Sequence, residues 1–144
     1  MNRAEIISAI ALFVSILSLL ASVLFNLRDR AHVIATCRFM PWWEENSAHV
    51  SVTVVNAGRR PIILRMWAGA ESKEKWVGTS LGERGTGLRL AEHETYEFSI
   101  QKHELIAVTP DEDVSIQDLW FEDTLGRRHP VKDAKANLAR LKVA

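Results

Sequence analysis

The feature that most constrains this chain is a run of twenty-two residues without a formal charge, from Ile6 to Leu27. At 1.5 Å per residue, a helix of this length spans about 33 Å, which matches the hydrocarbon core of a bilayer. The only polar side chains in the run are four serines and Asn26, so the helix would lack the polar face of a water-soluble one. The run therefore predicts a single transmembrane helix inside an anchor segment, residues 1–30.

A cleaved signal peptide is the alternative interpretation of this run, because Arg3 supplies a positive charge ahead of it. The apolar core is longer than the usual signal-peptide core of about 7–15 residues, and no A-x-A-like cleavage site comes before Arg28. These two features favour a retained anchor.

Small residues recur along the predicted helix at alternating steps of four and three, which places them on one side of it. Because apolar side chains gain little by leaving lipid for one another, helices associate in membranes through close backbone approach and interhelical hydrogen bonds. The stripe predicts packing against another transmembrane helix, of a second copy or of a larger membrane complex. Its members are Ala4, Ser8, Ala11, Ser15, Ser18 and Ser22.

The positive charges beside the run predict its orientation. Arg3 stands alone before it, whereas Arg28, Arg30 and Arg38 follow it. Since translocation of Lys and Arg is disfavoured, we expect the N-terminus outside and the remaining chain in the cytoplasm. The single cysteine, Cys37, agrees with a reducing compartment.

Beyond the anchor, the hydrophobic pattern changes to the alternation of β-strands. Turn residues separate the predicted strands, as in "NAGRRP" and "TLGR", and Pro130 predicts an edge position for the last strand. We expect a mainly β fold, an antiparallel Ig-like β-sandwich of about seven strands over residues 31–131, followed by a short helical tail over 132–144. Residues 70–89 predict a loose connection or a poorly paired hairpin. The clearest strands are residues 32–40, 49–55, 62–67, 96–100, 114–123 and 128–131.

Two segments of this region, "VVNAGRRPIIL" and "LWFEDTLGRRHPV", carry a resemblance. They resemble a pattern in small uncharacterised bacterial and phage proteins in which a β-sandwich follows an N-terminal membrane helix. The likeness extends from about Val50 to Val131, with a gap across the middle. It implies a sandwich on an anchor and no particular activity.

Two groups of side chains are candidate contact residues. Arg59, Arg60, Arg127 and Arg128 lie in two predicted turns and would form an anion or lipid-headgroup site if both turns share one end of the domain. They would otherwise be solvated turn residues. Trp42 and Trp43 in "PWWEEN" would point in opposite directions in an extended chain, so that one ring enters the core and the other reaches a membrane or protein interface.

Motifs of catalysis and cofactor binding are missing from the sequence. The five histidines form no zinc-binding motif, and no nucleophile elbow, phosphate loop or dinucleotide fingerprint occurs. We therefore expect no enzyme, metal or cofactor, and the balance of eighteen basic and eighteen acidic side chains argues against nucleic acid as a partner. Two functions remain: a membrane-anchored binding module acting as an accessory or assembly subunit, or an anchored sensor or carrier of a small anionic ligand.

Overall fold

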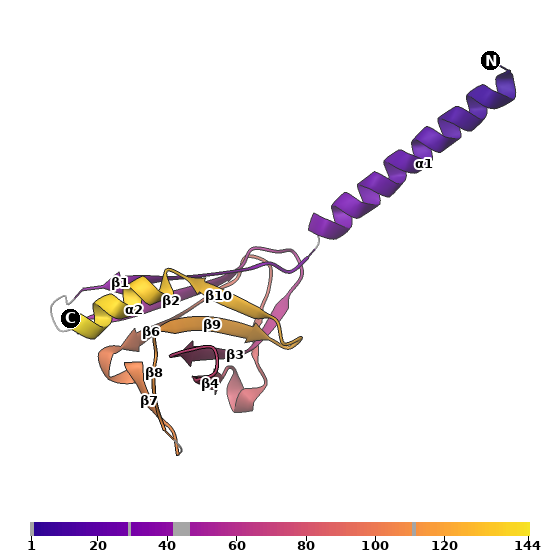
Figure 1. Cartoon of the computed structure of the whole chain (residues 1–144). Coiled ribbons are helices and arrows are strands. Elements are labelled where there is room, and N and C mark those ends of the chain that lie inside the picture. The colour runs from indigo at the N-terminus through magenta and orange to yellow at the C-terminus, as the bar shows by residue number, and fades with distance from the viewer. Residues whose placement is uncertain (1, 29, 42–46, 111) are drawn as a thin grey trace. The chain divides into compact units, whose positions relative to one another are not determined.

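The computed structural model describes residues 2–28, 30–41, 47–110 and 112–144 (Figure 1). The chain divides into two compact units, residues 1–30 and 31–144. The first unit contains helix α1 and the second, the head domain, contains every other element. The bounds are α1 Arg3–Arg28, β1 Val33–Met40, β2 His49–Asn56, β3 Ile62–Ala70, β4 Trp76–Ser80, η1 Glu83–Gly85, β5 Leu88–Leu90, β6 Thr95–Gln101, η2 Lys102–Leu105, β7 Ile106–Val108, β8 Asp113–Ser115, β9 Asp118–Asp123, β10 Arg128–Lys132 and α2 Ala134–Val143.

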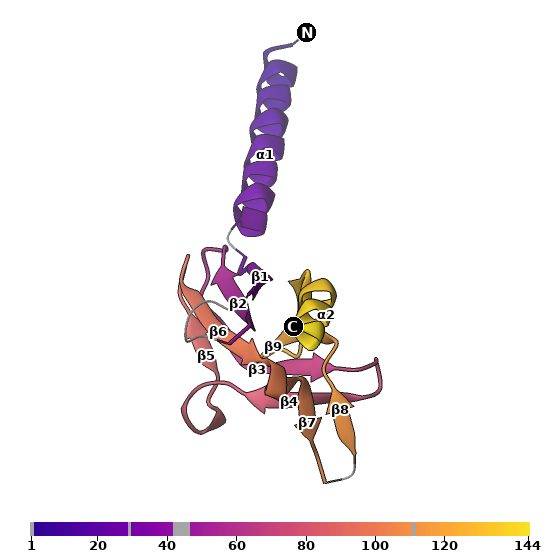
Figure 2. The same cartoon turned by 90° about the vertical axis from the view of Figure 1, so that its left-hand side faces the viewer.

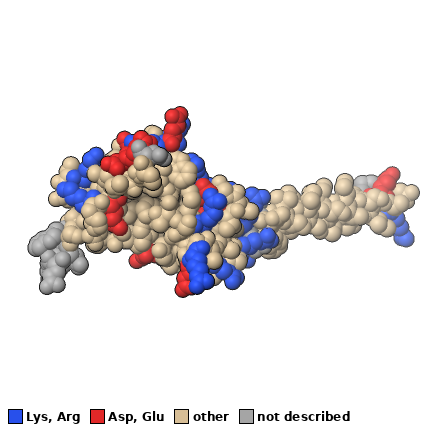
Figure 3. Space-filling view, turned by 90° about the horizontal axis from the view of Figure 1, so that it is seen from below, with Lys and Arg blue, Asp and Glu red and all other residues tan. Residues whose placement is uncertain are grey.

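Helix α1 contains the uncharged run, and it is long and apolar enough to cross a membrane. Its residues from 3 to 26 are exposed, and Figure 3 shows an uncharged surface along the helix. The Ser15 hydroxyl donates to the Ala11 carbonyl oxygen at 2.8 Å, which satisfies this polar group within the helix. Water would solvate such a surface poorly, whereas lipid would cover it.

The head domain is built on one curled eight-stranded sheet (Figure 2). The strands follow the order β4-β3-β9-β10-β1-β2-β6, and β5 pairs with β3 beside β4. Strands β7 and β8 form a separate two-stranded ribbon. The prediction of a mainly β fold with an N-terminal apolar helix and a short C-terminal helix is confirmed. An Ig-like sandwich of two sheets is not confirmed, because hydrogen bonds join eight strands into a single sheet, and one pair, β1 with β10, is parallel.

Because the sheet curls, its two edges lie close together. The chain passes from β5 at one edge to β6 at the other within a few residues. Strand β5 pairs with β3, and β6, which begins at Thr95, pairs with β2. The side chain of Asn56, which has no exposed surface, holds this crossing together. Its Nδ2 donates to the carbonyl oxygens of Arg60 (2.8 Å), Leu90 (3.2 Å) and Ala91 (3.1 Å). Asn56 therefore lies at the turn, as predicted, and its side chain also links β2 to the end of β5.

The concave side of the sheet holds the hydrophobic core. The alternation in β2 places Val50, Val52 and Val54 inside, where none of them is exposed. Helix α2 contributes Leu138 and Leu141 to the same core. Asn137 docks this helix on β1, because its Oδ1 accepts from the Phe39 amide and its Nδ2 donates to the Cys37 carbonyl, each at 3.1 Å. These contacts stabilise a helix that is too short to form alone.

Three predictions about the strands are corrected by the structure. The predicted strand 114–123 is two strands, β8 and β9, in different sheets, because the chain leaves one for the other at residues 116–117. Strand β10 lies inside the sheet, and Pro130 is tolerated there because pairing with β1 begins at the next residue, Val131. Within residues 70–89, β4 forms a paired hairpin with β3, in a register that runs from Met66–Ser80 to Ala70–Trp76.

Candidate binding surface

Two tryptophans come together on the convex side of the sheet. Strand β3 lies between β9, which carries Trp120, and β4, which carries Trp76. Trp120 pairs with Ala68 of β3, and Trp76 pairs with Ala70. Their ring centroids lie 5.9 Å apart. The neighbouring Gly78 leaves room for this arrangement, since a Cβ there would lie 3.2 Å from the Trp76 ring. Alanines on β3 and glycine on β4 leave space for the two indoles, and the Met66 side chain lies beside Gly78 on the same surface.

Arg128 of β10 reaches over both rings. Its Cζ lies 4.8 Å from the centroid of Trp120 and 5.8 Å from that of Trp76. A guanidinium so placed gains about 0.5–1 kcal/mol at an exposed site and keeps N–H groups for further hydrogen bonds. Trp76 is 39% exposed. An exposed indole beside a stacked arginine is the composition typical of protein-binding surfaces.

A cleft of about 610 Å³ begins at Trp120 and Arg128 and runs to helix α2. Its volume lies in the range of ligand sites. Ala70 and Ile116 line its apolar part, and α2 presents Lys135, Ala139 and Lys142 along one side, at the spacing of residues that share a helix face. The β3–β4 turn closes the cleft with Glu71, Ser72 and Lys73.

The charges around the cleft are mainly positive. Four basic side chains, Lys73, Arg128, Lys135 and Lys142, face two acidic ones, Glu71 and Asp118. Asp118 pairs with Lys135 at 3.5 Å and Glu71 with Lys75 at 3.1 Å, so each carboxylate already has a cationic partner. The indole N–H of Trp120 is buried and has no acceptor among the residues that the structure describes.

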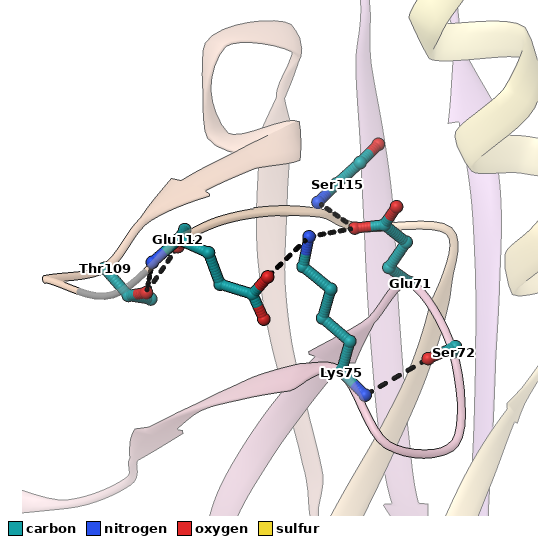
Figure 4. A network of polar contacts seen from close by, with 6 residues as sticks. All are labelled: Glu71, Ser72, Lys75, Thr109, Glu112 and Ser115. Carbon is teal, nitrogen blue, oxygen red and sulfur yellow. Dashed lines mark hydrogen bonds and ion pairs between the residues drawn. The ribbon is translucent and has the colours of Figure 1, made fainter.

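Lys75 joins the β3–β4 turn to the β7–β8 ribbon (Figure 4). Its Nζ lies 3.1 Å from Glu71 and 3.2 Å from Glu112. Glu71 also accepts a hydrogen bond from the Ser115 amide at 3.2 Å. The hydrogen bond from Lys75 lowers the pKa of Glu71, and its partner Glu71 raises the pKa of Lys75. The ribbon is thereby tied to the turn that borders the cleft.

The two arginine-bearing turns lie at one end of the sheet. The Thr124 amide of the β9–β10 turn donates to the Ile63 carbonyl at 3.1 Å, next to the β2–β3 turn that carries Arg59 and Arg60. Arg127 Nε lies 2.9 Å from a carboxylate oxygen of Asp123, and Arg128 is turned toward the tryptophans. The four arginines therefore do not form one site. Arg59 and Arg60 lie in the β2–β3 turn, Arg127 pairs with Asp123, and Arg128 stacks on the tryptophans.

Asp123 organises the β9–β10 turn, in which Gly126 has the expected positive φ of 75°. Only 1% of Asp123 is exposed. Its carboxylate accepts from the Leu125 and Arg127 amides at 2.9 and 3.0 Å and lies 3.1 Å from His129 Nε2. Burial by itself raises the pKa of this carboxyl, but these hydrogen bonds outweigh burial and lower the pKa below its ordinary value.

The other sequence-based candidates divide into described and undescribed residues. Trp42 and Trp43 lie outside the described residues. The six small residues of α1 are all exposed in their helix, so the stripe remains a prediction. In the parts of the chain that the structure describes, no three His, Cys, Asp or Glu side chains converge to hold a metal ion. Burial raises the pKa of the Cys37 thiol, which makes it a poor nucleophile.

The fold defines this chain as an apolar helix followed by a curled β-domain. No family model and no curated protein matches it. Among solved structures, it is similar to one described as "X-ray structure of Northeast Structural Genomics Consortium target SoR45", with 12% identity over 70% of this chain and 79% of that chain and a TM-score of 0.29.

The convex tryptophan surface and the cleft were not foreseen from the sequence. Trp76 lies within residues 70–89, for which a loose connection or a poorly paired hairpin was predicted. Trp120 comes near it because β9 pairs with β3, which lies far away in the chain. One signal was present, because Trp120 and Trp76 each lie one residue from a smaller apolar neighbour, in "DLW" and "KWV". Local alternation places a tryptophan on the opposite face from its neighbour, but it does not say which strands share that face.

Proposed function

We propose that this protein is a single-pass membrane-anchored binding module that serves as an accessory or assembly subunit. Helix α1 is the observation that carries the proposal, because twenty-two uncharged residues form a helix whose exposed surface has no core to cover it. In water this surface would be an aggregation hazard, whereas a bilayer would solvate it. The resemblance of the sequence to helix-anchored β-proteins supports the same proposal.

In this proposal the head domain contacts a partner protein through the surface of Trp76, Trp120 and Arg128. Exposed aromatic rings with an arginine stacked on them supply large contact area at a small cost in side-chain entropy. The small-residue stripe of α1 adds helix–helix contacts with a second copy or with the partner's own membrane segment. The positive charges after α1 support a cytoplasmic head domain with the N-terminus outside.

Membrane fractionation of cells that express the full chain tests the anchor. We expect the protein in the membrane pellet after alkaline extraction, and its intact mass should include residues 1–30. The matched control replaces Leu17 and Leu20 by Arg in the middle of α1, at a cost of about 2.5–3.5 kcal/mol for each residue, and should release the protein. A mature protein that lacks α1 would identify a signal peptide and refute the anchor.

A second candidate function is the anchored sensor or carrier of a small anionic ligand. The hydrogen bond from Thr124 to Ile63, which brings the turns of Arg59, Arg60 and Arg127 to one end of the sheet, favours it. An increase in thermal stability with phosphate or a soluble inositol phosphate, lost in Arg59→Gln and Arg60→Gln, would support this function. A Tm independent of these anions would exclude it.

A further inference from the structure

We infer that the cleft between Trp120 and helix α2 binds an acidic segment of a partner protein, one with carboxylate side chains beside an apolar residue. This inference rests on the proposed binding function and names the chemistry of the partner. The observations that carry it are the charges of the cleft, its apolar lining and the buried N–H group of Trp120.

The charges select an anionic occupant. Glu71 and Asp118 form ion pairs with Lys75 and Lys135, and Glu71 also interacts electrostatically with Lys142, so two carboxylates only partly neutralise the four basic side chains of the cleft. Lys73 has no ion-pair partner among the described residues, and Lys142 extends from the last turn of α2 on the same side as Lys135. Two carboxylates of an extended segment would meet Lys73 on the turn and Lys142 on the helix, with Arg128 at the other end of the cleft.

Trp120 supplies a directional contact. Its buried Nε1–H has no acceptor among the described residues, and leaving a buried donor unpaired is unfavourable. Because this group has almost no exposed surface, a carbonyl or carboxylate oxygen of the occupant would accept its hydrogen bond once the side chains that cover it move aside. The apolar lining of Ala70, Ile116 and Leu138 accommodates an apolar side chain next to the charged ones, as in other peptide-binding grooves.

Fluorescence anisotropy on the full chain in uncharged detergent micelles tests the inference. The probe is a short fluorescein-labelled peptide in which Glu and Leu alternate, and a peptide with Gln in place of Glu is the neutral control. We expect saturable binding of the acidic probe only. Reversal of two charges, Lys73→Glu with Lys142→Glu, should weaken binding roughly tenfold or more. The matched control, Arg89→Glu with Lys102→Glu, reverses two exposed charges outside the cleft and should leave the affinity unchanged.

A spectroscopic measurement tests the role of Trp120. Its indole N–H resonance, assigned by its loss in Trp120→Phe, should move downfield when the acidic probe binds. The inference would be overturned if Lys73→Glu with Lys142→Glu left the affinity for the acidic probe unchanged, or if the neutral peptide bound equally well. Displacement of the probe by phosphatidylglycerol vesicles but not by unlabelled acidic peptide would reassign the cleft to lipid. Because the peptide assay uses micelles, a failure of membrane anchoring would not change its outcome.

Discussion

The rings of Trp67 on β3 and Phe98 on β6 lie 5.4 Å apart between centroids, although four strands lie between β3 and β6 in the order of the sheet. The contact exists because the sheet curls and brings its two ends together across the core. Phe98 also meets Phe121 of β9 edge-on, at 6.1 Å. The contacts among these three rings form only when the sheet is curled.

Removal of either ring should therefore destabilise the whole head domain. We expect Trp67→Ala and Phe98→Ala each to lower the free energy of unfolding by about 3 kcal/mol, and the double mutant to show a coupling of about 0.5–1.5 kcal/mol. Urea unfolding of the full chain in micelles measures both quantities. Ser99→Ala, on the exposed face of the same strand, should change stability by less than about 0.5 kcal/mol. Strict additivity of the two ring deletions would contradict a contact across the curl.

Asn56 should be sensitive to the replacement of its amide by a carboxyl group. Asn56→Asp keeps the shape but places an acceptor against the carbonyl oxygens of Arg60, Leu90 and Ala91. We expect a loss of about 3 kcal/mol at pH 7 and partial recovery at lower pH, where the protonated carboxyl can donate. Thermal unfolding at several pH values measures this dependence. A variant as stable as the wild type at pH 7 would show that Asn56 does not hold the crossing.

Asp123 should make the head domain sensitive to acid. Its pKa is lower in the folded chain than in the unfolded one, so its contribution is present above the unfolded pKa of about 3.9 and is lost as the pH falls through the folded pKa. Asp123→Asn should cost about 2–3 kcal/mol at pH 7 and should show a smaller further loss on acidification. Urea titrations between neutral pH and pH 3 test this, with Asp113→Asn as the exposed control. Parallel pH profiles for Asp123→Asn and wild type would disprove the role.

Loss of Lys75 should loosen the β7–β8 ribbon more than it lowers the stability of the whole head domain. Lys75→Met removes both ion pairs that join the ribbon to the β3–β4 turn. Because these groups are partly exposed and screened by water, we expect little change in the free energy of global unfolding, together with faster hydrogen exchange at Ala107 and Val114. Lys73→Met is the matched control from the same turn. Unchanged exchange in the ribbon would show that other contacts hold it.

The stripe of α1 should respond to bulk on one side of the helix. Ser8→Leu with Ser15→Leu should weaken helix–helix association in vesicles, because larger side chains prevent close backbone approach. Energy transfer between labelled copies detects a homo-oligomer, and co-purification from membranes with and without the substitutions detects a larger complex. Ile10→Leu with Ile16→Leu, off the stripe, should have no effect. Equal association of both variants would refute the stripe.

The sequence by itself determined the elements whose signal is local. The uncharged run specifies α1 because it has the length of a membrane-spanning helix and lacks the polar face that a water-soluble helix needs. Alternation specifies β1, β2, β3 and β6 because one face of each strand is buried, and Asn56 and Gly126 mark turns through their own backbone preferences. Each of these signals is contained in a few neighbouring residues.

Only the tertiary structure decided which strands are neighbours. The parallel pairing of Ala35 with Val131 and the curl that brings Trp67 to Phe98 join residues far apart in the chain. The same is true of the cleft, in which Trp120, Lys73 and Lys142 come from three separate elements. Period and turn chemistry describe one strand at a time, whereas strand order depends on which buried faces fit together across the core, and that fit is a property of the whole domain.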